Sequence, residues 1–143
     1  DLAMSLGGNP IFLRSQDKPL YHASIVMMGG LLSGMVGAIA DLWQNFGICR
    51  AEAVGALTPI IQGNVTALNT NGLPGAIAGP YARGDIGTVR KHLMAIKTHA
   101  PDILHVYCEM ALSGLPYAVE KGNVSVDRAT DIKKLLVEVV GDR

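Results

Sequence analysis

The chain has 143 residues, of which 49% are hydrophobic, a length that suits one domain around a single core. Its 12 Lys and Arg residues balance its 12 Asp and Glu residues, so no net charge would hold it to nucleic acid or to an anionic membrane surface. Cys49 and Cys108 are too few for a disulfide framework and follow no metal-ligand spacing. This usage favours free thiols that pack in the interior, in a reducing cytoplasmic compartment.

The N-terminal residues predict the end of one element followed by a short strand. The stretch "DLAMSLGG" leads to a Gly8-Asn9 turn signal and then to the apolar run "PIFL" at residues 10–13, which is typical of a strand. The chain starts without Met and without a signal-peptide pattern. We therefore expect it to be a piece of a longer protein.

One long helix is predicted from Asp17 to Phe46. The only helix breaker is Pro19, which a first turn tolerates because its missing N–H would be unpaired there anyway. A helix that is apolar on all sides is expected to be buried. Its small face and its larger apolar stripe are made by Ala23, Gly30, Gly34 and Gly37, and by Met28, Leu32, Met35, Ile39 and Leu42.

A membrane span is the alternative for this segment. Residues 23–40 carry no charge, include Gly30-x-x-x-Gly34, and lie between Tyr21 and Trp43, as in a span with aromatic anchors. Against the span, the glycines weaken the hydropathy, neither flank has a Lys or Arg bias, and later helices carry apolar stripes that need a central partner. We favour the buried helix.

Four further helices are predicted. They run from Ala51 to Asn69 with a kink at Pro59 and an end at Gly72, from the Asp85 N-cap, from Pro101, and from the Ser125 N-cap. The residues expected to face inward are, in turn, Val54, Leu57, Ile61, Val65 and Leu68; Ile86, Val89, Leu93 and Ile96; Ile103, Tyr107, Met110, Gly114 and Tyr117; and Ile132, Leu135, Leu136 and Val139. The fold class is therefore all-α, a helical bundle around one long central helix.

The stretch "GPYARGDIGTVRKHL", residues 79–93, holds most of the charge in the middle of the chain. Its Arg-Gly-Asp tripeptide is not interpreted as an adhesion motif, because an intracellular helical domain meets no such receptor. Gly84 would allow an unusual backbone angle, and Asp85 would cap the next helix. For Arg83 the pattern leaves two roles open, a bidentate grip on a carboxylate or phosphate and simple solvation.

Two stretches carry a family resemblance. "DKPLYHAS" and "AGPYARGDIGTVRKHL" resemble the C-terminal domain of the Rossmann-like proteins classed as domain of unknown function 2520. Those proteins are more distantly similar to 6-phosphogluconate dehydrogenase, ketopantoate reductase and pyrroline-5-carboxylate reductase. The resemblance covers roughly Leu6 to Val119. It departs from the family pattern at Gly29-Gly30, where the family has Ser-Asn, and at Ala78, where it has Thr.

The resemblance implies a fold like the C-terminal domain of 6-phosphogluconate dehydrogenase. Residues 1–15 would be the tail of an N-terminal Rossmann domain, and residues 16–143 a helical domain that binds a small-molecule substrate and forms a homodimer. NADP, or NAD, would be bound mainly by the Rossmann domain, because no Gly-x-Gly-x-x-Gly turn occurs in the chain. The chain alone would then be inactive. A non-catalytic module that oligomerises or binds a partner through the Gly-rich helix is the alternative.

Lys18 and His22 are the candidate catalytic residues. They are four residues apart at the start of the long helix, so they share a face, and the helix dipole there disfavours their charged forms. Such groups suit general acid/base work, and the related β-hydroxyacid dehydrogenases resemble this arrangement in placing a helix-borne Lys beside the hydride acceptor. Simple solvation of Lys18, or packing of His22 under Tyr21, stays open.

The remaining site expectations concern the substrate and metals. We expect the substrate to be contacted by Tyr21, Arg83, Gln62 and Asn69. A metal site is not expected, because His92, His99 and His105 pair neither with one another at helical spacing nor with a cysteine.

Overall fold

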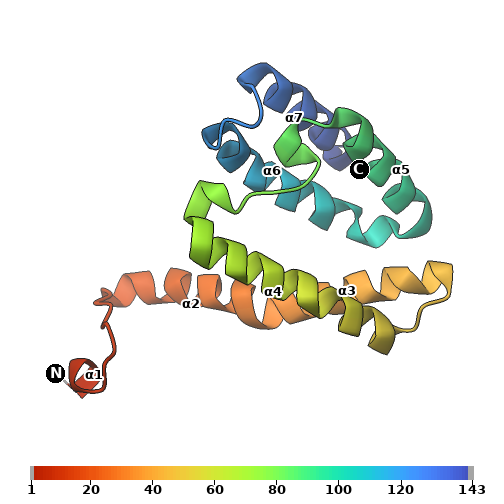
Figure 1. Cartoon of the computed structure of the whole chain (residues 1–143). Helices are drawn as coiled ribbons and strands as arrows, with labels where there is room; N and C mark the ends of the chain where they lie inside the picture. The colour runs from red at the N-terminus through yellow and green to blue at the C-terminus, as the bar shows by residue number, and fades with distance from the viewer. Residues whose placement is uncertain (1, 142–143) are drawn as a thin grey trace. The chain divides into compact units, whose positions relative to one another are not determined.

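The computed structural model describes residues 2–141, without the side chain of residue 140, and these residues form helices and no strand. Asp1, at the head of the predicted Rossmann remnant, and residues 142–143 lie outside the described residues. The chain divides into two compact units, residues 1–37 and 38–143. Because their relative placement is not fixed, each unit is described by itself (Figure 1).

The first unit is a short helix followed by the start of the long one. Helix α1 spans Leu2–Ser5, and a 3₁₀ turn, η1 at Ser15–Asp17, leads into α2 at Lys18–Val26. A π-helical segment, η2 at Met27–Leu31, joins α2 to α3 at Leu32–Leu42. The strand predicted at residues 10–13 is not formed, because a strand without a neighbouring strand leaves its backbone groups unpaired.

The long helix is confirmed, but its predicted burial is wrong for α2 and η2; in α3, Ala40 is buried and the stripe residues Leu32, Met35, Ile39 and Leu42 are partly buried. Helical segments follow one another from Ser15 to Phe46, with Pro19 in the first turn of α2. Neither α2 nor η2 has a buried residue, and the side chain of Met28 is 70% exposed. The physical reason is that a single helix cannot cover its own apolar surface, and the first unit contains no second element of comparable size that could cover α2 and η2.

The second unit holds the hydrophobic core. After η3 at Trp43–Phe46 come α4 at Arg50–Gly75, η4 at Tyr81–Arg83, α5 at Ile86–His99, η5 at Pro101–Ile103, α6 at Leu104–Glu120 and α7 at Val126–Gly141. Helices α5, α6 and α7 pack together (Figure 1). The core is made by Ala82, Val89, Leu93, Leu104, Cys108, Ala111, Leu115, Ala118, Val124, Ala129, Ile132 and Leu136. The core of the bundle is therefore built around α6 and not around the long helix.

The predicted inward faces are confirmed in α5 and α7 and are wrong in α6 and α4. In α6 the buried positions are Leu104, Cys108, Ala111, Leu115 and Ala118, each one residue beyond the predicted ones. In α4 only Ala53 is buried, whereas Val54, Val65 and Leu68 are exposed. No other element of the unit covers most of this helix, so its apolar stripe stays in solvent.

Local capping signals fix the starts of α5 and α7 as predicted. Asp85 accepts hydrogen bonds from the backbone N–H of Thr88 at 2.9 Å and from its hydroxyl at 2.7 Å, and these bonds, the backbone one first, hold the pKa of Asp85 below its usual value. Ser125 Oγ accepts from the N–H of Arg128 at 3.2 Å. Gly72, with φ of +59°, interrupts the regular path of α4, which resumes as far as Gly75.

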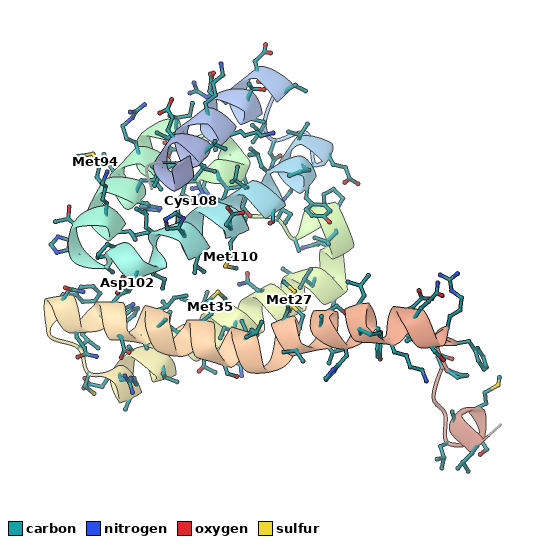
Figure 2. The ribbon with its side chains drawn as sticks, turned by 180° about the vertical axis from the view of Figure 1, so that it is seen from behind. Met27, Met35, Met94, Asp102, Cys108 and Met110 are labelled. Atoms are coloured by element: carbon teal, nitrogen blue, oxygen red, sulfur yellow. The ribbon has the colours of Figure 1, made fainter. Side chains whose placement is uncertain are left out.

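The two cysteines have different environments. Cys108 is fully buried among α5, α6 and α7 (Figure 2), as predicted. Cys49 is exposed and occupies the N-cap of α4, where its N–H donates to Glu52 Oε2 at 3.2 Å. The expectation that Cys49 packs in the interior is therefore wrong.

We predict that Leu136→Ala lowers the free energy of unfolding of the second unit by about 2–5 kcal/mol, because it leaves a cavity in the core. Leu136 is 0% exposed, whereas its neighbour Val137 is 48% exposed. The matched control, Val137→Ala, is expected to change stability by no more than about 0.5 kcal/mol. Urea denaturation followed by circular dichroism measures both, and equal effects would contradict the assigned core.

Candidate functional site

Three of the predicted site residues lie on α2 in the first unit. Lys18, Tyr21 and His22 occupy its first two turns and are exposed. Among the described residues, no hydrogen bond or ion pair holds Lys18 or His22, and the nearby carboxylate of Asp17 is bound by Arg14 at 2.7 Å. The two candidate catalytic side chains thus share one face, with their polar atoms accessible to a ligand.

The other three predicted site residues lie in the second unit. Gln62 and Asn69 are exposed on α4, and Arg83 is exposed in η4. Gln62 and Asn69 are two helical turns apart, so they lie on one face of α4. Arg83 lies in solvent two residues before Asp85, the N-cap of α5, and makes no hydrogen bond among the described residues.

Tyr81 lines a concavity in the second unit and is not among the candidate site residues predicted from the sequence. It follows the Gly79-Pro80 turn, in which Gly79 has φ of +111°. Its ring lies against Gly114 in α6, where an added Cβ would be 2.6 Å from the Tyr81 hydroxyl oxygen. Burial raises the pKa of the Tyr81 phenol. A glycine in the middle of a helix was the available signal, since such a residue marks a close approach.

Lys121, at the end of α6, forms hydrogen bonds with the backbone at and just after the end of α4. Its Nζ donates hydrogen bonds to the carbonyl oxygens of Gly75 at 2.7 Å and of Ile77 at 2.8 Å. Bonds from an ammonium group are stronger than those between neutral groups. They fix the segment that runs from the kink at Gly72 to Tyr81.

A concavity of about 260 Å³ lies between α4 and this segment. We call it the Tyr81 pocket; its walls are Asn64, Leu68, Leu73, Ala76, Ile77, Ala78 and Tyr81. None of these side chains is charged. Gln62, Asn69 and Arg83, the residues that the sequence predicted to contact the substrate in this unit, are not among its walls.

A second polar contact joins α5 to α6. His92 Nδ1 and the Tyr107 hydroxyl are 3.0 Å apart, and the two rings meet edge to face with centroids 5.9 Å apart. Burial, with smaller contributions from Cys108 and Tyr81, raises the pKa of Tyr107. Because Tyr107 packs against the core, this pair serves to hold α5 on α6. Within residues 2–141, no group of three His, Cys, Asp or Glu side chains could hold a metal ion.

Comparison with known proteins identifies a family. A family model described as "Domain of unknown function (DUF2520)" matches residues 1–113. No curated protein and no solved structure matches the chain. The matched range contains both stretches on which the sequence resemblance rests, and it includes α2 and all seven walls of the Tyr81 pocket. Its description names no activity, so function has to be argued from the residues.

We predict that Tyr81 and Tyr107 ionise at higher pH in the folded protein than a free phenol does, because burial raises the pKa of both above the ordinary value of 10.0. The unfolded chain releases these protons first, so the stability that depends on them is fully present below pH 10 and is lost as the pH rises through the folded-state pKa. Alkaline titration of absorbance at 295 nm should lose one late component in Tyr81→Phe and one in Tyr107→Phe. If the curves of these variants differ from that of the wild type only below pH 10, where an ordinary phenol titrates, the raised pKa values of Tyr81 and Tyr107 are contradicted.

Proposed function

The chain belongs to the DUF2520 family, and we propose that it is the helical substrate-binding and dimerisation part of an NAD(P)-dependent oxidoreductase of the cytoplasm. The observation that carries the proposal is that Lys18 and His22 lie on one exposed face of α2 and that neither side chain makes a hydrogen bond or ion pair among the described residues. The resemblance of "DKPLYHAS" to the C-terminal domain of the Rossmann-like DUF2520 proteins, which are more distantly similar to such enzymes, supports it.

Lys18 and His22 would handle a proton at a substrate oxygen. Oxidation or reduction of a hydroxyl or carbonyl requires a proton to leave or reach that oxygen, and Lys and His side chains are suited to this transfer. The chain's own residues do not fit the phosphates of a dinucleotide, since the described part has no strand and the sequence has no Gly-x-Gly-x-x-Gly turn. The coenzyme would therefore be held by another domain, and this chain would contribute the substrate side.

We predict that Lys18→Met and His22→Ala each lower turnover on the order of 10²-fold or more, in a protein that joins this chain to its dinucleotide-binding domain and with a substrate found by screening. Coenzyme affinity should stay unchanged. Lys133→Met, which removes an exposed ammonium from α7, is the matched control and should keep full activity. Wild-type turnover in both test variants would overturn the catalytic assignment.

Dimerisation is proposed from the apolar surface of the long helix. Leu20, Met27, Met28 and Leu31 are each at least 60% exposed, and a contiguous apolar surface of this kind marks an interaction site. An added Cβ on Gly30 or Gly34 would meet no atom within 4 Å, so the glycines leave room for a close helix–helix approach. A second copy of the chain is the proposed partner.

We predict that the wild-type chain is a dimer at tens of micromolar and that Gly34→Leu shifts it toward the monomer, because the added side chain fills the space needed by the partner. Light scattering coupled to size exclusion measures the mass. Gly63→Leu is the matched control: Gly63 also lies in a helix, and a Cβ there also meets no atom within 4 Å. A stable wild-type monomer would contradict the proposal.

A membrane span is the second candidate for the same segment. The helix Ser15–Phe46 is the one in the described residues that is long and apolar enough to cross a membrane, judged by length and composition alone. Its exposed apolar surface fits lipid as well as a second copy. A chain that stays in the membrane fraction and is released only by detergent would favour the span over the dimer.

A further inference from the structure

We propose that the Tyr81 pocket binds a small, uncharged organic molecule that has an apolar body and one hydrogen-bonding group. This pocket belongs to the second unit and Lys18 and His22 to the first, and the proposal does not depend on the proposed oxidoreductase activity. Its volume, about 260 Å³, lies just below the range of roughly 300–1,000 Å³ typical of ligand pockets. The occupant is therefore smaller than a nucleotide or a drug-sized ligand.

The lining selects for a neutral ligand. Five of the seven walls are aliphatic, namely Leu68, Leu73, Ala76, Ile77 and Ala78, and the sixth is the ring of Tyr81. A charged group placed against them would lose hydration without gaining a partner of opposite charge. The nearby ammonium of Lys121 is already bound to the Gly75 and Ile77 carbonyls and is not one of the walls.

Asn64 supplies the polar contact. Its side chain is exposed, is the one amide in the lining, and makes no hydrogen bond among the described residues. A carboxamide presents two donors and one acceptor oxygen. It can therefore bind a ligand amide, ketone or hydroxyl while the apolar walls hold the rest of the molecule.

One side of the pocket is held in place before any ligand binds. Lys121 fixes the carbonyls of the segment that carries Ala76, Ile77 and Ala78. The close approach of Tyr81 to Gly114 sets the position of its ring. Walls that are already held in place reduce the entropy lost on binding. The opposite side of the pocket is made by Asn64, Leu68 and Leu73, which are exposed on α4.

The test uses the full chain and three probes of the same ring and similar size: benzamide, benzoate and benzylamine. Two-dimensional ¹⁵N NMR titration should show benzamide shifting backbone amides within residues 64–81, with a dissociation constant at least tenfold lower than those of the charged probes. Benzamide shifts confined to other parts of the chain, or equal binding of the three probes, would overturn the proposal.

A pair of variants on α4 tests the polar contact. Asn64→Ala should weaken benzamide binding by about 2- to 12-fold, the loss expected for one neutral hydrogen bond. Asn71→Ala removes the same amide from an exposed position of α4 that does not line the pocket, and it should bind benzamide as the wild type does. If Asn64→Ala binds benzamide as tightly as Asn71→Ala does, Asn64 is not the polar contact and the proposed ligand class is wrong.

Discussion

The second unit depends on the packing of α6 against α7. Small side chains on α6, Cys108, Ala111 and Ala118, lie in the same core as Ile132 and Leu136 of α7, and both of these are fully buried. Burying a side chain of that size contributes about 1.5–3 kcal/mol. Because Tyr81 rests on Gly114 and Lys121 follows the last turn of α6, the same helix also places the walls of the Tyr81 pocket. Stability and site geometry in this unit therefore have a common origin.

The features of the fold that the sequence predicts are those with local causes. The caps at Asp85 and Ser125 and the break at Gly72 follow from residues that act within one helical turn. The face of α6 was predicted one residue away from the true one because the helix is apolar on more than one side. Tyr107 and Met110 suggested a stripe by their size, whereas the core selected the small residues Cys108 and Ala111. Burial of the long helix and of α4 depends on partners that periodicity does not specify.

In the candidate site, too, the features with local causes follow from the sequence, and those that depend on distant contacts do not. That Lys18 and His22 share a face follows from the helical repeat alone, and the structure has both on α2. The sequence predicted polar contacts on α4 at Gln62 and Asn69, but Asn64 is the amide that lines the pocket, because the kink at Gly72 within α4 turns the following segment toward that side. The contact of Lys121 with residues 75 and 77 spans more than 40 positions. No local pattern marks a contact over that distance.

In the long helix, the segment Met27–Leu31 has low intrinsic helical stability and also exposes apolar side chains. The π-helical segment Met27–Leu31 contains Gly29 and Gly30, and each glycine costs about 1 kcal/mol relative to Ala in a helix interior. The flanking Met27, Met28 and Leu31 are exposed and contribute no burial within the unit. Helices in proteins gain most of their stability from packing an apolar face. A partner that covers this surface would therefore stabilise the helix where it is weakest, so association and the order of the helix that carries Lys18 and His22 are thermodynamically linked.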